Sequence, residues 1–205
     1  DFSQDSEKVD VIIDFSSPAA LAGELEYAVK NNVPAVLAST GYAAEQLERI
    51  KEAAKSVAVF KTANFSLGVN LLVALAKKAA AALGENFDIE IVERHHSQKV
   101  DAPSGTALML ADGMNEVLAE KRPYVEGRSG IVGKRGNEIG IHAVRGGTIV
   151  GEHEVMFAGE DEIVTLSHSA RSKKVFAAGA IKAAKWIAGK PAGLYDMTDV
   201  LGDIL

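Results

Sequence analysis

Three potentially cationic side chains, His95, His96 and Lys99, lie within five residues of one another. The segment Pro103–Thr106 follows them and is typical of the beginning of a helix, with Ser104 as a possible cap. The N–H groups and the dipole at a helix N-terminus favour an anion. We therefore expect a pocket for a small dianion, with one carboxylate on Gly105 and Thr106 and the other near the histidines and the lysine.

The same cluster has the residue types for proton transfer. A histidine titrates near neutral pH, so one imidazole can donate a proton while Lys99 keeps its charge. Any one of these residues alone would be better explained as a capping, core or solvated side chain, but a cluster beside a helix start favours a site. Zinc is disfavoured because His95 and His96 are adjacent and point to opposite faces of a strand.

The histidines further along the chain, His142, His153 and His168, are each predicted to be surface or satisfied core residues. His142 and His153 would face each other across a hairpin, which leaves a weak alternative of a metal site there. The sequence Arg145-Gly146-Gly147 predicts a tight hairpin turn with an exposed arginine.

Strand-like and helix-like segments alternate at the start of the chain. We predict strands at 9–15, 33–38 and 57–60 and helices at 18–31 and 43–54. Ser17 is the expected N-cap of the first helix, Pro18 its first residue, and Asn31-Asn32 its end. This order predicts βαβ units on a parallel sheet, which bind ligands beyond the carboxyl ends of their strands.

The remaining chain follows a different pattern. A helix over 66–83 leads to segments of period two at 87–91, 138–145, 148–157 and 162–169. They predict a mixed, mainly antiparallel sheet with one face solvated or packed on a partner. A helix over 104–119 interrupts the sheet, a long loop over 121–137 follows it, and a helix over 173–188 precedes the end of the chain. Loops of this length are usually functional or mobile.

Composition narrows the classes of protein. Of 205 residues, 47% are hydrophobic and 24% charged, as in an ordinary globular protein. The net charge of -6 argues against a nucleic-acid surface, and we find no apolar run of 18 residues that would span a membrane. There are no cysteines, which excludes disulfides and thiolate nucleophiles and is consistent with a reducing cytoplasm. The polar, acidic segment Asp1–Asp10 is unlike a signal peptide.

The segment Glu93–Ala107 closely resembles the signature of the 4-hydroxy-tetrahydrodipicolinate reductase family, also called the dihydrodipicolinate reductase family. It reads Glu-Arg-His-His-x-x-Lys-x-Asp-Ala-Pro-Ser-Gly-Thr-Ala. The resemblance continues through 39–41, 63–70, 138–145 and 150–153, and so covers nearly the whole chain. The family begins with a glycine-rich phosphate loop and a cofactor-discriminating residue, and neither occurs in this sequence. We therefore expect the N-terminal part of the nucleotide domain to be missing from it.

The resemblance implies a reductase of lysine biosynthesis by the diaminopimelate route, which uses NADH or NADPH and forms a homotetramer. It implies a partial, Rossmann-like dinucleotide-binding domain at 1–65 and 176–205, and an α+β substrate-binding and oligomerisation domain at 66–175. Hydride would add to C4 of a cyclic imine dicarboxylate, and a proton would then add at C3.

The family's site residues carry over position by position. His95 corresponds to the acid/base residue and Lys99 to the proton donor. His96, Gly105 and Thr106 correspond to substrate-binding residues. The cofactor-binding residues would be Ala38, Ser39, Thr40, Thr62, Ala63, Asn64 and Phe65. Ala38 stands where a glycine is common in relatives, which a backbone contact should tolerate.

Two rival classes remain. A semialdehyde dehydrogenase would need a cysteine nucleophile, and the sequence has none. A non-catalytic dicarboxylate-binding or scaffold module is the alternative that applies if the glycine-rich half is genuinely absent from the protein.

Overall fold

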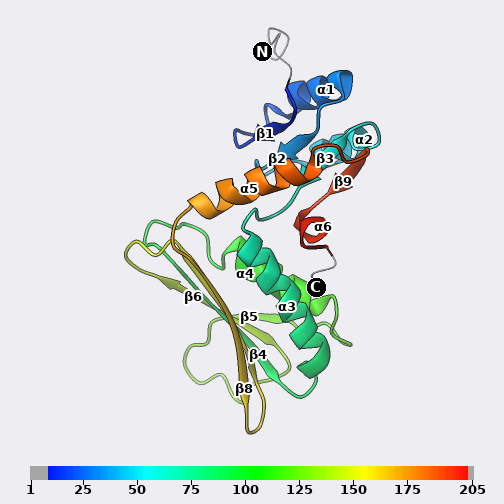
Figure 1. The fold of residues 1–205 in the computed structure, drawn as a ribbon. Coiled ribbons are helices and arrows are strands. Elements are labelled where there is room, and N and C mark those ends of the chain that lie inside the picture. Colours follow the sequence, from blue (N-terminus) through cyan, green and yellow to red (C-terminus); the bar gives the residue numbers. More distant parts are fainter. Residues whose placement is uncertain (1–8, 203–205) are drawn as a thin grey trace. The chain divides into compact units, whose positions relative to one another are not determined.

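The structure, a computed structural model, describes residues 9–202. Residues 1–8, which form most of the acidic segment discussed above, and residues 203–205 lie outside that range. The chain divides into two compact units (Figure 1): Asp1–Leu67 with Lys174–Leu205, and Gly68–Lys173.

The first unit is built on a four-stranded parallel sheet in the order β1-β2-β3-β9. The strands are short: β1 is Ile12–Asp14, β2 is Ala35–Leu37, β3 is Ala58–Lys61 and β9 is Gly193–Tyr195. Because all four are parallel, their carboxyl ends lie at one edge of the sheet. The sequence predicts the first three of these strands but not β9.

Helices cover both faces of this sheet, as its two-sided apolar pattern requires. Ala35 and Leu37 of β2 pack in the core with α1 (Leu21–Asn31) and α2 (Ala44–Ala53). Val36, between them, packs in a second core with α5 (Lys174–Ile187) and α6 (Met197–Leu201). The predicted α/β fold with a Rossmann-like parallel sheet is confirmed.

The first helix begins later than predicted. Its N-cap is Ala20, without a side-chain hydrogen bond, so the prediction that Ser17 caps it and Pro18 opens it was wrong. The Asp14 carboxylate accepts both the N–H and the hydroxyl of Ser16, which holds the chain in a turn before the helix can start. The predicted end is confirmed, since the C-cap Asn32 has the left-handed conformation.

The second unit contains a five-stranded sheet in the order β5-β6-β4-β7-β8. The strands are β4 (Asp88–His95), β5 (Tyr124–Glu126), β6 (Ile139–Arg145), β7 (Gly151–Ala158) and β8 (Ile163–Ala170). The β4–β6 and β5–β6 pairs are parallel, and the β4–β7 and β7–β8 pairs are antiparallel. The sheet is mixed, as expected, but more of its strand pairs are parallel than the period-two pattern suggested.

The predicted tight hairpin at Gly146-Gly147 was wrong, because β4 lies between β6 and β7. The connection instead passes across the end of β4. The Gly146 N–H donates to the His95 carbonyl at 2.9 Å, and the Ser97 N–H donates to the Gly147 carbonyl at 3.2 Å. Sequence spacing alone does not distinguish a hairpin from a short crossing over an intervening strand.

One face of this sheet packs against α3 (Leu67–Leu83) and α4 (Gly105–Asn115). Ile89 and Ile91 of β4 are fully buried in that core. The other face carries charged residues, and it anchors the long loop after α4. Arg128 and Arg135 of that loop both donate to Glu90 at 2.8–3.0 Å. The loop also contributes β5, so ion pairs and strand pairing hold it in place.

Within residues 9–202, none of the helices is both long and apolar enough to cross a membrane.

Packing of α5 in the first unit depends on a glycine. A Cβ added to Gly179 would lie 1.7 Å from the carbonyl oxygen of Phe65, a backbone atom that cannot rotate away. We expect Gly179→Ala to destabilise the protein by about 1–3 kcal/mol in urea unfolding, because the helix must shift outward. Gly146→Ala is the control, since its methyl group would meet no atom within 4 Å. Equal stability of the two variants would contradict the close approach.

Candidate active site

A buried carboxylate lies at the centre of the candidate site. Glu93 is on the helix-facing side of β4 and has no exposed surface. It accepts two hydrogen bonds of 2.7 Å from the Arg145 guanidinium and one of 3.0 Å from the Ser104 N–H. Its Oε2 lies 2.6 Å from His95 Nδ1. Burial raises the pKa of Glu93, but hydrogen bonds from Arg145, His95 and Ser104 outweigh it and hold the pKa below its usual value.

Arg145 is therefore not the exposed turn residue that its sequence context predicted. Its side chain is about one-fifth exposed and neutralises Glu93 in a bidentate pair. Arg145 Nη2 also donates a hydrogen bond to the Asp101 carbonyl at 2.8 Å. The arginine thus connects the end of β6 to the loop that follows β4.

His95 is fixed by the contact with Glu93. Because Glu93 is a carboxylate and accepts only, His95 Nδ1 must carry the proton in this bond. The other ring nitrogen, Nε2, is then the one able to exchange a proton with a ligand. This is the arrangement required of an acid/base histidine: one nitrogen is oriented by a carboxylate and the other is available.

A second histidine packs edge-on against His95. The centroid of the His153 ring is 5.2 Å from that of His95, at an interplanar angle of 72°. Burial, and then the charge of His95, lower the pKa of His153 to about 4, so His153 is neutral near pH 7. Its Nε2 lies 3.0 Å from Ser104 Oγ, and that oxygen caps α4 by accepting the Ala107 N–H. His153 thus contacts the serine side chain that caps α4.

The metal alternative at His142 and His153 fails on geometry. In the β4 register His142 pairs with Val92 and His153 with Glu93, so β4 separates them and their side chains lie on opposite faces. His142 instead contacts Glu90 at 2.7 Å.

Lys99 has a partner that sequence analysis did not identify. Its Nζ donates to both carboxylate oxygens of Asp101, at 2.7 and 2.9 Å. The hydrogen bond from Lys99 lowers the pKa of Asp101. The loop after β4 therefore presents Lys99 as an ammonium held by a neighbour two residues away.

The other predicted substrate residues belong to the same unit. His96 directly follows β4 and is half-buried. Gly105 and Thr106 are the first residues of α4, next to the Ser104 cap, so they lie at the positive end of the helix dipole. A side chain at Gly105 would meet no atom within 4 Å, so its backbone is open to approach.

The predicted cofactor residues lie in the first unit, beyond the carboxyl ends of two neighbouring parallel strands. Ala38, Ser39 and Thr40 follow β2, and Thr62–Phe65 follow β3. Local hydrogen bonds shape both loops. Ser39 Oγ donates to Asp14 at 2.6 Å, and Asn64 Oδ1 accepts the Ser66 N–H at 2.8 Å. Of these residues only Phe65 is buried, and the edge at which they lie is the one where parallel α/β sheets bind ligands.

Sequence analysis missed Glu93, Arg145, Asp101 and His153 as members of the site. One signal was available. Glu93 lies on the same face of β4 as the core residues Ile89 and Ile91, where an acidic residue is unusual. Arg145 and His153 lie in stretches that share the resemblance, but only strand pairing shows that they reach Glu93.

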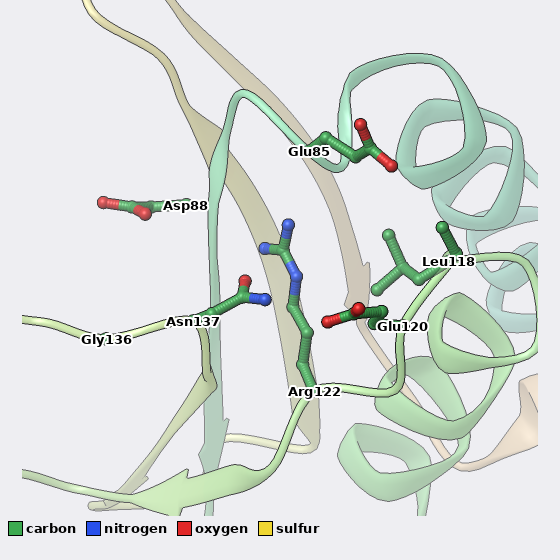
Figure 2. A pocket seen from close by; sticks show the side chains of 8 residues that line it. Glu85, Asp88, Leu118, Glu120, Arg122, Gly136 and Asn137 are labelled. Carbon is green, nitrogen blue, oxygen red and sulfur yellow. The ribbon is translucent and has the colours of Figure 1, made fainter.

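A separate cavity of about 460 Å³ lies at the opposite end of β4 (Figure 2). Its lining includes Arg122, whose guanidinium points between Asn137 and Glu85, together with Asp88 and Glu120. Asp88 begins the eight-residue strand that His95 ends. At about 3.3 Å per residue the cavity is far from the His95 cluster, so it is not part of the candidate site.

A Rossmann-like sheet, together with an acid–histidine pair beside a lysine and a helix start, defines the class of NAD(P)-dependent oxidoreductases. Two family models match the chain: "Dihydrodipicolinate reductase, N-terminus" at residues 1–65 and "Dihydrodipicolinate reductase, C-terminus" at residues 68–201. On this evidence, together with the relatives below, the chain belongs to the dihydrodipicolinate reductase family.

Curated relatives are similar over nearly the full chain. The 4-hydroxy-tetrahydrodipicolinate reductase of Caldanaerobacter subterraneus subsp. tengcongensis is 54% identical over 98% of this chain and 80% of its own length. That of Clostridium novyi is 54% identical over 94% of this chain and 76% of its own. A solved dipicolinate-bound dihydrodipicolinate reductase from Paenisporosarcina sp. TG-14 has a TM-score of 0.76 and 28% identity, over 91% of this chain and 71% of that one.

The Glu93–Arg145 pair can be tested through stability. Arg145→Met should destabilise the protein by about 3–5 kcal/mol, because it leaves a buried carboxylate without its counter-charge. Glu93→Gln combined with Arg145→Met should recover part of that loss, as measured by urea unfolding in a double-mutant cycle. Arg94→Met is the control, since Arg94 lies 3.9–4.0 Å from its half-buried glutamate partners, and its loss should cost under about 1 kcal/mol. Strictly additive effects would contradict the pair.

Proposed function

We propose that the chain catalyses the NAD(P)H-dependent reduction of 4-hydroxy-tetrahydrodipicolinate to tetrahydrodipicolinate in the diaminopimelate route of lysine biosynthesis. The observation that carries this proposal is the Glu93–His95 contact of 2.6 Å inside the family's signature segment. It orients one histidine nitrogen and leaves the other for a ligand, beside Lys99 and the start of α4. Close relatives named as this reductase support the proposal.

The substrate is a dianion, and both of its carboxylates have suitable partners. One would bind the backbone of Gly105 and Thr106 and the Thr106 hydroxyl, at the positive end of the helix dipole. His96 would contact the substrate from the loop after β4. The Ser104 cap, supported by His153, keeps this first turn rigid, so little ordering remains when the carboxylate binds.

Reduction needs a hydride and a proton from different sources. A bound reduced nicotinamide supplies the hydride to ring C4. The proton for C3 would come from Lys99, with His95 as the acid/base residue that shares in its transfer. The two cationic groups would also stabilise the electron-rich ring before it is protonated. Asp101 holds the Lys99 ammonium until the substrate competes for it.

The nicotinamide would contact Ala38, Ser39, Thr40, Thr62, Ala63, Asn64 and Phe65. We propose that the cofactor is NADH or NADPH, and that the protein acts in the cytoplasm as a homotetramer. Light scattering coupled to size exclusion measures that state.

The direct test of function is oxidation of NADH and of NADPH by the 205-residue chain with freshly generated substrate. Substrate-dependent loss of nicotinamide absorbance supports the reductase. Dicarboxylate binding without nicotinamide oxidation, and without NADH binding, would support the non-catalytic module instead.

Lys99→Ala and His95→Ala should lower kcat by about 100-fold or more, because each removes a group that acts on the proton. The Kd for NADH, measured by fluorescence, should change less than about threefold, since neither residue belongs to the cofactor loops. Lys55→Ala, at an exposed lysine of the first unit, is the matched control. Wild-type turnover in either variant would remove that residue from the mechanism.

Thr106→Val should mainly raise KM, by about tenfold, because it replaces a hydroxyl donor to the substrate carboxylate with a methyl group of the same shape. Steady-state kinetics at saturating NADH separate KM from kcat. An unchanged KM would exclude the hydroxyl contact.

A further inference from the structure

A second buried acidic group lies in the first unit, at the carboxyl end of β1. Asp14 is 5% exposed and Glu24, on α1, is 3% exposed. The two carboxyl groups lie close enough for each to shift the pKa of the other. Two carboxylates offer only acceptors, so a hydrogen bond between them requires a proton on one.

The hydrogen-bond partners show which group carries that proton. Asp14 already accepts the Ser16 N–H at 2.7 Å, the Ser16 hydroxyl at 2.5 Å and the Ser39 hydroxyl at 2.6 Å. Three donors stabilise a carboxylate. Within the described part of the chain Glu24 has no such donors, and its Oε2 is buried without a partner. Asp14 is therefore the anion and Glu24 the acid.

The charges around the pair agree with this assignment. Burial raises the pKa of Asp14, but the bonds from Ser16 and Ser39 outweigh it and the pKa is lowered. Burial, followed by the charge of Asp14, raises the pKa of Glu24 to about 7. The phenol of Tyr42 is the other titratable group close to both, and its pKa is raised to about 12, first by burial, so it stays neutral. Among residues 9–202, no lysine, arginine or histidine contributes to the pKa of Glu24.

Asp14 joins the two loops that follow β1 and β2. Its side chain binds Ser16 in one loop and Ser39 in the other, and its carbonyl accepts the Ala38 N–H at 2.8 Å. Ala38 and Ser39 are two of the proposed nicotinamide contacts. Any charge that displaces the Asp14 carboxylate would therefore move the backbone that holds the cofactor.

We propose that Glu24 is a positioning residue for the cofactor: as a neutral carboxylic acid it donates to Asp14, and so keeps the Ser16 and Ser39 loops in the conformation that binds the nicotinamide. This role rests on the proposed function. When Glu24 loses its proton, two buried carboxylates repel each other, and the loops that Asp14 joins lose their shared anchor.

The consequence is a pH dependence of both stability and cofactor binding. The folded-state pKa of Glu24, about 7, lies above its ordinary value of 4.5. Protonated Glu24 therefore stabilises the folded state fully when the pH is below the ordinary pKa of 4.5. This contribution is lost as the pH rises through about 7. NADH affinity should fall over the upper part of the same range.

The test compares the wild type, Glu24→Gln and Glu26→Gln, all as the 205-residue chain. The amide introduced by Glu24→Gln remains neutral at every pH and can still donate to Asp14. Glu26 is an exposed glutamate on the same helix, so Glu26→Gln makes the same chemical change away from the pair. Without ligand, thermal unfolding is followed from about pH 5 to about pH 8. The wild type and Glu26→Gln should lose stability relative to Glu24→Gln as the pH rises.

Binding of NADH, followed by fluorescence from about pH 6.5 to about pH 8.5, tests the positioning role. The Kd of the wild type and of Glu26→Gln should rise by about tenfold or more above pH 7, while that of Glu24→Gln stays nearly constant. Parallel Kd profiles for all three chains would overturn the positioning role and leave the reductase intact. Failure of every chain to bind NADH at any pH would overturn the proposed function, and the positioning role with it.

Discussion

The buried contact between Glu93 and Arg145 is the constraint on which the second unit's site depends. A carboxylate without exposed surface must be neutralised, and the bidentate arginine does so across two parallel strands. The same carboxylate then orients His95 and accepts the Ser104 N–H at the start of α4. One buried charge thus fixes His95, the loop after β4 and the helix N-terminus together.

The first unit also contains a buried carboxylate that joins separate segments of the chain. Asp14 is the last residue of β1, and Glu93 lies near the end of β4. Each carboxylate accepts hydrogen bonds from segments that are distant in sequence. The difference lies in how the charge is compensated. Glu93 is balanced by a guanidinium, whereas Asp14 is held by hydroxyl and N–H donors and lies beside Glu24, a carboxyl group whose pKa burial raises to about 7. The role proposed for Glu24 makes the second arrangement respond to pH near neutrality.

Sheet topology decides which residues share each site. Placing β4 between β6 and β7 brings Arg145 and His153 to either side of Glu93, and sends His142 to the opposite face with Glu90. The long loop after α4 is held on that second face by Arg128 and Arg135. Separate charge clusters therefore occupy the two faces of one strand.

The sequence by itself determined most of the elements and the family signature around His95, because periodicity and the long signature are local properties. It predicted the Rossmann-like sheet, the helix start at Ser104 and the end of α1 at Asn32. Only the tertiary structure decided that Arg145 is buried against Glu93, that β6 lies parallel to β4, and that Ser17 does not cap α1. Those outcomes depend on strand order and on side chains far apart in the chain, since a buried charge can be assigned a partner only once the backbone has brought the two together.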